Sequence, residues 1–223
     1  GVSYLTRVVY ASEAGAILDS DVYAGGGTDD TAVLQSVLDK APEWGGLNLI
    51  MDGAALVSGL RVHSDTTITC LNKSCGFFLK AHSNRAIVEN ADRNYGAIGN
   101  HNISLIGGTY NHNCREQEHH TEGIDPALRE YEKAISASCL YQGTIPCFAL
   151  RFTGVQNLLV RDITIRNQRT YAMMTENFRF VTMENIIIDL PDKTHGQNQD
   201  GLHFLGPGQF LTLRNISGNA GDD

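Results

Sequence analysis

Residues 149–160 read ALRFTGVQNLLV, and RDITI follows at residues 161–165. The same rhythm returns from residue 172 as AMMTENFRFVTM before ENIII, and from residue 202 as LHFLGPGQFLTL before RNIS. An earlier copy, YGAIGNHNISL before IGGTY, starts at residue 95. The starts of the last three copies are 23 and 30 residues apart, and the surplus falls in residues 190–196, where a loop can absorb it. Such a repeat predicts the stacked rungs of a solenoid.

The runs between the turns are short and rich in β-formers, so the solenoid should be all-β, a single-stranded parallel β-helix forming one domain over residues 1–223. Candidate strands lie at residues 47–51, 66–71, 76–80 and 103–106. A β-sandwich of independent hairpins would also give many short strands, but it does not explain copies that stay in phase. We therefore expect the backbone of each rung to pair with the rungs above and below it.

The N-terminal region, about residues 1–50, is expected to cap this solenoid with a helix. Gly25-Gly26-Gly27-Thr28-Asp29-Asp30-Thr31 supplies a glycine turn followed by side chains that can cap a helix. An apolar stripe follows at helical spacing, and Pro42 with Gly45-Gly46 ends it. Its members are Val33, Leu34, Val37, Leu38 and Ala41. Asp29 and Asp30 are interpreted as helix caps, not as catalysts.

A second helix is expected in an inserted segment at about residues 113–141, which interrupts the repeat. Asp125-Pro126 provides a cap and a first-turn proline. One helix face would then carry Leu128, Tyr131, Ile135 and Cys139. Glu118-His119-His120 and Glu122 could suggest a metal site, but consecutive histidines diverge on a regular element, so a solvated loop is favoured and no metal is predicted.

The composition of the chain argues against several classes of function. The formal net charge of −8 and the lack of a Lys/Arg run argue against general nucleic-acid binding. No apolar stretch is long enough to span a membrane, and no signal peptide is visible at the start. The five cysteines favour buried thiols over a disulfide framework, although Cys70 with Cys75 or Cys139 with Cys147 could pair.

Three aspartates form the strongest candidate site. Asp200 lies in Gln197-Asn198-Gln199-Asp200-Gly201, and Gly221-Asp222-Asp223 places Asp222 one rung, 22 residues, later. Adjacent rungs are about 4.8 Å apart, so the carboxylates should be neighbours, and their repulsion should make one hold its proton more tightly. Glycoside hydrolysis with inversion needs this combination: an acid for the leaving oxygen and a base for water, with room for that water between them.

Asn198-Gln199-Asp200-Gly201 and Gly221-Asp222-Asp223 resemble the Asn-Thr-Asp-Gly and Gly-Asp-Asp motifs of glycoside hydrolase family 28, the polygalacturonase group. Residues 26–31 also resemble the Gly-Asp-Gly-x-Thr-Asp-Asp-Thr opening of pectin-degrading β-helix proteins. The resemblance implies a right-handed helix, single displacement, no metal and no organic cofactor. It also implies that Asp200 and Asp223 position the attacking water and that Asp222 is the general acid.

The sequence departs from that pattern in places. Gln199 replaces the usual Thr, His203 stands where the family often has Asp, and Gly26 replaces the Asp of the opening motif. The later Gly-His-Gly and Arg-Ile-Lys motifs, which grip the substrate's carboxylate in polygalacturonases, do not occur before residue 223. The chain is therefore expected to be a C-terminally incomplete piece, and uronic-acid specificity has no support from these motifs.

Further site residues surround Asp200. Asn198 and His203 are expected to bind substrate, and His195 or His203 could modulate the ionisation of Asp200. Tyr171, one rung below, is suited to stacking on a sugar ring, although core packing explains it equally well.

The sequence thus predicts a secreted or periplasmic O-glycosyl hydrolase acting on a polysaccharide or oligosaccharide. Two alternatives remain on the same fold. One is a Ca²⁺-dependent polysaccharide lyase, in which clustered aspartates hold the cation. The other is a non-catalytic, tailspike-like glycan-binding module. Calcium dependence and unsaturated products identify the lyase, and binding without turnover identifies the module.

Overall fold

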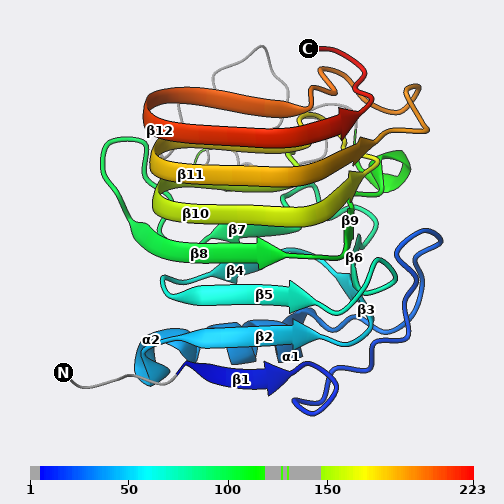
Figure 1. Ribbon diagram of the computed structural model, residues 1–223. Helices are drawn as coiled ribbons and strands as arrows, with labels where there is room; N and C mark the ends of the chain where they lie inside the picture. The colour runs from blue at the N-terminus through cyan, green and yellow to red at the C-terminus, as the bar shows by residue number, and fades with distance from the viewer. Residues whose placement is uncertain (1–5, 119–126, 128–129, 131–146) are drawn as a thin grey trace.

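The computed structural model describes residues 6–118, 127, 130 and 147–223. Its strands form one twelve-stranded sheet that coils into stacked rungs, with β1 at one end and β12 at the other (Figure 1). The pairings of the named strands are parallel. The strands are β1 (Arg7–Tyr10), β2 (Leu47–Met51), β3 (Ala54–Val57), β4 (Leu60–Val62), β5 (Thr66–Cys70), β6 (Gly76–Leu79), β7 (Val88–Asn90), β8 (Asn100–Ile106), β9 (Thr109–Asn111), β10 (Leu150–Arg166), β11 (Met173–Asp189) and β12 (Leu202–Gly218). A parallel sheet curled into a solenoid is what the repeat predicted.

The three long strands carry the repeat. β10 pairs with β11 at a constant offset, from Leu150 opposite Met173 to Arg166 opposite Asp189. The pairing of β11 with β12 shifts by one residue between Glu176 and Phe178. Before this shift, residues of β11 lie opposite residues of β12 that are 29 positions later, so the predicted 30-residue spacing is one residue too long there. After it the spacing is 30 residues as predicted, because Gly206-Pro207 adds a residue to β12.

The copy predicted to start at residue 95 is only half correct. β8 does pair with β10, with Leu105 opposite Val160 as the alignment requires. The other half is wrong, because residues 94–99 form no strand, residues 95–97 form a bend, and Tyr95 is exposed. Val88 takes its place opposite Leu150. Alternating apolar residues identified the strand, but the connection before it could not be read from the repeat.

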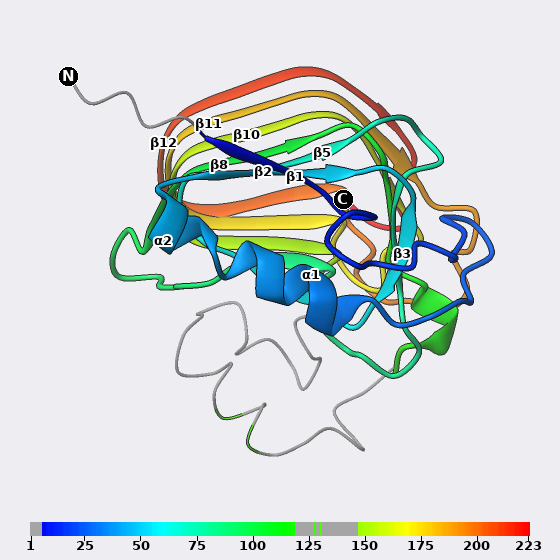
Figure 2. The same ribbon diagram turned by 90° about the horizontal axis from the view of Figure 1, so that it is seen from below.

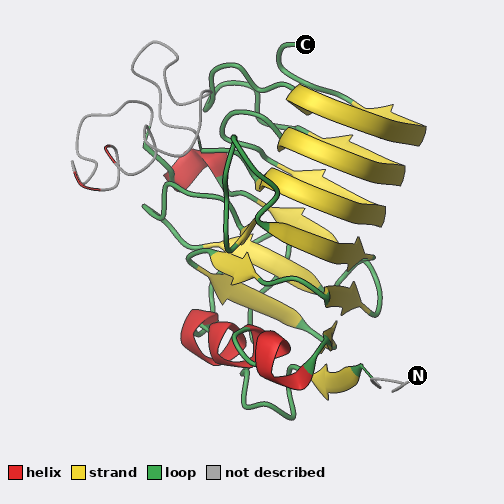
Figure 3. Ribbon diagram, turned by 90° about the vertical axis from the view of Figure 1, so that its left-hand side faces the viewer, coloured by secondary structure: helices red, strands yellow, loops and turns green. Residues whose placement is uncertain are grey.

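The N-terminal helix lies where it was expected but is shorter. α1 (Thr31–Leu38) ends before the predicted Ala41, and a separate turn of helix, α2 (Ala41–Trp44), follows with Pro42 in its first turn. Both helices lie at the β1 end of the stack, away from the C-terminus (Figure 3). Viewed from that end, α1 runs beside the coil (Figure 2), and Leu34 and Leu38 join the core. The cap of residues 1–50 also includes β1 and part of β2, which already pair as strands.

The predicted capping role of Asp30 is wrong. Asp30 occupies the N-cap position of α1, but its side chain caps no helical N–H. Its buried carboxylate instead accepts the backbone N–H groups of Ile17 and Leu18, at 2.8 and 2.9 Å. Asp29 does accept the N–H of Thr31, at 2.9 Å. The side chain of Asp30 therefore ties the preceding loop to the helix start, since a carboxylate satisfies whichever buried donors lie within reach.

One corner of the coil repeats the same backbone conformation on successive rungs. We call these five residues the corner column: Asp65, Asn102, Asn157, Phe180 and Phe210. All have φ between 52° and 60°, the left-handed region that favours Asn and Asp. In its lower part the side-chain amides form a ladder, from Asn157 to Asn102 at 3.0 Å and from Asn102 to Asp65 at 2.9 Å. In its upper part the rings of Phe180 and Phe210 stack, with centroids 4.6 Å apart.

Within the inserted segment the structure describes residues 113–118, Ala127 and Glu130, and a short 3₁₀ turn, Cys114–Glu116, begins it. The helix predicted around Leu128, Tyr131, Ile135 and Cys139 lies outside the described residues. The four cysteines that the structure describes, Cys70, Cys75, Cys114 and Cys147, are buried. Cys70 and Cys75 form no disulfide with each other, and Cys139, the suggested partner of Cys147, lies outside the described residues. Within the described ranges, no helix has the length and apolar character needed to cross a bilayer.

Candidate active site

Two backbone hydrogen bonds place the two aspartate motifs side by side. Gly221 N–H donates to the carbonyl of Gln199 at 2.8 Å, and Gly201 N–H donates to the carbonyl of Asp223 at 3.0 Å. Asp222 therefore lies over Asp200 across one rung, as the 22-residue spacing predicted. Asp222 and Asp223 are exposed, whereas Asp200 is buried. The structure thus brings the three predicted carboxylates together and shields one of them from water.

The surroundings of Asp200 change its acidity. Burial raises the pKa of this carboxyl above its ordinary value, and the charges of Asp222 and Asp223 act in the same direction. The hydrogen bond and charge of His203 lower the pKa of Asp200 and offset part of that rise. Repulsion was the predicted reason for one carboxyl holding its proton more tightly. The structure makes burial the larger cause.

His203 lies against Asp200. Its Nδ1–H can donate to Asp200 Oδ2, at 3.1 Å, so both side chains lie on the same side of the strand start. The imidazole also stacks on the ring of Tyr171, with centroids 4.3 Å apart and planes 9° apart. Tyr171 in turn stacks on Phe148 at 4.8 Å. Tyr171 is therefore one layer of an aromatic stack that carries the histidine.

A buried amide pair supports the first motif from below. Gln199 Nε2 donates to the backbone carbonyl of Gln168 at 2.8 Å, and Gln168 Nε2 donates to the carbonyl of Asp200 at 3.3 Å. Gln199, the replacement for the usual Thr, thus points inward and fixes the backbone on which Asp200 stands. Asn198 precedes it with φ of 50° and is partly exposed, so its side chain lies within reach of solvent beside the motif.

The segment below the site is held by a buried histidine. His112 Nδ1 accepts the backbone N–H of Arg169 at 2.9 Å, and its Nε2–H donates to the carbonyl of Arg85 at 3.0 Å. Burial lowers the pKa of His112 to about 4, so the ring is neutral at neutral pH. Because Arg169 lies two residues before Tyr171, His112 fixes the start of the segment that carries the aromatic stack.

His195, the other histidine predicted near Asp200, has a different partner. Its Nδ1 lies 2.8 Å from Asp192 Oδ2, and Arg115 Nε lies 2.5 Å from the same carboxylate oxygen. The arginine and the local hydrogen bonds hold the pKa of Asp192 far below its usual range. His195 thus belongs to the ion-paired loop beside the site, and His203 is the histidine that contacts Asp200.

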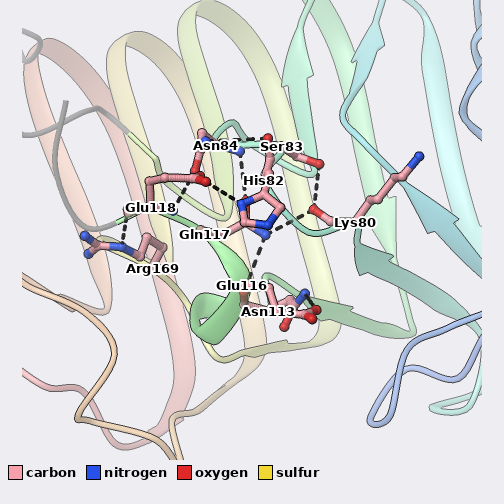
Figure 4. Close-up of polar contacts among 9 residues, drawn as sticks. All are labelled: Lys80, His82, Ser83, Asn84, Asn113, Glu116, Gln117, Glu118 and Arg169. Atoms are coloured by element: carbon pink, nitrogen blue, oxygen red, sulfur yellow. Dashed lines mark hydrogen bonds and ion pairs between the residues drawn. The ribbon is translucent and has the colours of Figure 1, made fainter. Parts of the chain in front are cut away.

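A polar clamp joins two loops on the flank of the coil (Figure 4). Asn84 N–H donates to Gln117 Oε1 at 2.8 Å, and Glu118 N–H donates to Asn84 Oδ1 at 2.9 Å. The imidazole of His82 pairs with the carboxylate of Glu118. Burial raises the pKa of Glu118, but hydrogen bonds, chiefly from His82, together with the His82 charge lower it overall. Arg169 Nε donates to the carbonyl of Glu118 at 2.9 Å.

Of the suggested Glu118-His119-His120-Glu122 cluster, Glu118 is the described member, and the clamp engages it. Across the part of the chain that the structure describes, no three His, Cys, Asp or Glu side chains are grouped to hold a metal ion.

Sequence reasoning missed Phe148, Gln168 and His112. Phe148 had a signal, because it precedes its repeat copy by one residue as Tyr171 does, so the two aromatic rings share a phase. Gln168 and His112 had none, since each acts through a backbone partner in an irregular connection. Such contacts depend on how two loops meet.

In comparisons with known proteins, no protein-family model matches the sequence. A polygalacturonase of Persea americana is 28% identical over 91 residues, which is 39% of this chain and 19% of that protein. The chain therefore matches about a fifth of the length of this relative.

Solved structures give the fold. A family 28 exopolygalacturonase of Yersinia enterocolitica superposes with a TM-score of 0.70 at 17% identity, covering 97% of this chain and 44% of that one. The A-module of a mannuronan C-5 epimerase from Azotobacter vinelandii superposes with a TM-score of 0.61 at 12% identity, covering 94% and 50%. Proteins with two different activities thus share this coil, and this chain spans about half of each. The chain is a polygalacturonase-like right-handed β-helix.

Proposed function

We propose that the protein hydrolyses a glycosidic bond of a polysaccharide with inversion, using Asp200, Asp222 and Asp223. The observation that carries the proposal is the pairing of residues 199–201 with residues 221–223, which brings Asp222 and Asp223 beside a buried Asp200. The partial similarity to a polygalacturonase supports it. Inverting hydrolysis requires one carboxyl to act as the acid and another as the base.

The roles follow the family resemblance. Asp222 donates a proton to the departing glycosidic oxygen, and its exposure leaves it open to substrate. Asp200 and Asp223 position and deprotonate the attacking water. Asn198 completes the site as a neighbour of the bound sugar, His203 lies against Asp200, and no metal enters this proposal.

The test compares Asp→Asn variants on a panel of polysaccharides that includes polygalacturonate. New reducing ends measure hydrolysis, and proton NMR of the first product reports inversion or retention of the anomeric configuration. Asp222→Asn should lower kcat by about 100- to 10,000-fold, the usual contribution of a general acid. It should lose less on a substrate with a good leaving group, which needs no proton. Asp200→Asn should lose activity on both substrates.

Asp162 offers a matched control. It is an exposed aspartate on β10 whose carboxylate accepts a hydrogen bond from Asn185 at 2.8 Å, away from the site. Asp162→Asn should leave hydrolysis unchanged. Calcium-dependent release of unsaturated products would overturn the proposal in favour of a lyase. Glycan binding without turnover, unaffected by Asp222→Asn, would replace it with a binding module.

A further inference from the structure

We propose that His203 is a positioning residue for Asp200: it aims the carboxyl and keeps it able to ionise, while Tyr171 and Phe148 hold its imidazole in place. This inference rests on the proposed function, because it assigns a task to a neighbour of the proposed base. It differs from substrate binding, since His203 acts through Asp200 and not through the sugar.

The hydrogen bond from His203 orients the Asp200 carboxyl. His203 follows Asp200 by three residues across Gly201, and its Nδ1 lies 3.1 Å from Asp200 Oδ2. An imidazole can donate this hydrogen bond either as the neutral Nδ1–H tautomer or as the imidazolium. One carboxylate oxygen is therefore committed to the histidine, which leaves the other oxygen of Asp200 to accept a proton from water.

The aromatic stack restrains the histidine. The Tyr171 ring lies parallel to the imidazole at 4.3 Å, so rotating the imidazole out of this plane would break the contact. Phe148 supports the other side of the stack. The stack thus keeps Nδ1 directed at Asp200.

The charges around Asp200 show why such help is needed. Asp222 and Asp223 face its carboxyl from the segment after β12, His203 faces it from β12 itself, and Tyr171 lies in the segment before β11. Burial and both aspartates oppose ionisation of Asp200. A base that activates water must be ionised. His203 acts in the opposite direction from these effects, whereas an aspartate at position 203 would have added to them.

The experiment titrates Asp200 directly, by ¹³C NMR of the aspartate side-chain carboxyl carbons, with Asp200→Asn used to assign the signal. His203→Phe keeps a ring on Tyr171 but removes the donor, and His203→Asn keeps a donor near Nδ1 but removes the charge. Both should move the Asp200 midpoint to higher pH, with the larger shift in His203→Phe. Tyr171→Ala should move it in the same direction, and Tyr171→Phe should restore the parent value. Asp162→Asn serves as the unshifted control.

Two outcomes would overturn the inference. One is an Asp200 midpoint that stays in place or moves to lower pH in both His203 variants. The other is an equal shift in Tyr171→Phe and Tyr171→Ala, which would show that the stack is not the restraint. Circular dichroism of each variant identifies any that fails to fold, and Tyr171→Phe then carries the comparison.

Kinetics separates this inference from the proposed function. If the parent hydrolyses a polysaccharide, the acidic limb of its kcat/KM profile should move to higher pH in His203→Phe, with the lost activity recovered as the pH rises. A substrate-binding role would instead raise KM at every pH. If no substrate is turned over, the proposed function fails, and the NMR titration still decides whether His203 controls Asp200.

Discussion

The corner column lies at a bend of the coiled sheet and the aspartate site lies at the two ends of β12, and they tolerate change differently. In the corner column, the same left-handed conformation accepts Asp, Asn or Phe on successive rungs. Side chains of one kind contact each other on neighbouring rungs, Asn157, Asn102 and Asp65 by amide hydrogen bonds at 2.9–3.0 Å and Phe180 with Phe210 by ring stacking at 4.6 Å. Around Asp200 each partner is of another kind: a histidine, an inward glutamine and a paired aspartate motif.

The corner column repeats one structural role on each rung, whereas each residue around Asp200 has a role of its own. A repeated position needs a compatible φ and a neighbour of similar kind, so several residue types satisfy it. At the site, removing one side chain leaves a buried polar group without its hydrogen-bond partner. Keeping that group out of water then costs free energy and destabilises the fold. Substitutions at the site should therefore cost more than matched substitutions in the corner column.

The largest contrast should appear in turnover. Asp200→Asn should lower kcat by about 100- to 10,000-fold, because the base is lost while the fold is kept. Asn157→Asp, the reverse exchange in the corner column, should leave kcat unchanged, since Asp65 already shows that an aspartate fits this column. Steady-state kinetics on the substrate found in the panel measures both. A comparable loss in Asn157→Asp would remove the distinction between the two corners.

The next largest effect is expected in the dependence of stability on pH, because of His112 below the site. Its folded pKa of about 4 lies below the ordinary value of 6.5, so its stabilising contribution is complete above about pH 6.5 and is lost as the pH falls towards 4. The loss should reach about 3 kcal/mol of unfolding free energy. Urea unfolding at a series of pH values measures it.

His112→Asn should be less stable at pH 8 but should lack this acid-dependent loss, because an amide does not titrate. His101→Asn, at an exposed histidine, should keep the parent's pH dependence. Equal acid sensitivity in the parent and His112→Asn would mean that other groups cause it.

Gln199→Leu tests the buried amide pair. It removes the donor to the Gln168 carbonyl and should lower the unfolding free energy by about 1–3 kcal/mol, since that buried acceptor loses a partner. Gln209→Leu, on the exposed surface of β12 next to the corner column, should change it by less than about 0.5 kcal/mol. Chemical denaturation of the two variants compares them. Similar values would show that burial of Gln199 carries no special cost.

The smallest effect is expected at Phe180. Phe180→Asn loses a ring stack worth about 0.5–1.5 kcal/mol. It also relieves the strain of a bulky residue in the left-handed region, which is of order 1 kcal/mol. These terms oppose each other, so the unfolding free energy should change by less than about 1 kcal/mol. A measured loss above about 2 kcal/mol would show that the corner column depends on its aromatic pair.

Most of the coil could be predicted from the sequence, because side chains that recur in phase encode rungs that stack in register. The strand at residues 47–51 lies where its apolar residues placed it, and the spacing of Asp200 and Asp222 placed them on neighbouring rungs. The failures share a cause. Asp30 and the turn around Tyr95 depend on which loop lies nearby, and the repeat carries no information about that.

His203 shows the same limit at the site. The sequence placed His203 close to Asp200. For Tyr171, the ring that supports His203, the sequence left two roles open: stacking on a sugar and packing in the core. The stack became visible once Tyr171 and Phe148 were placed on successive rungs.

Two adjacent residues of one rung contact the chain on either side of residues 119–146. Arg169 Nε donates to the carbonyl of Glu118 at 2.9 Å, and Thr170 Oγ1 donates to the carbonyl of Cys147 at 2.7 Å. The segment therefore leaves and rejoins the coil at a fixed pair of anchors. Because the entropy of closing a loop grows only slowly with its length, sequences of other sizes fit between the same anchors at little cost. This position is therefore a graft point, where the length of the connection between Glu118 and Cys147 can change without changing the register of the rungs.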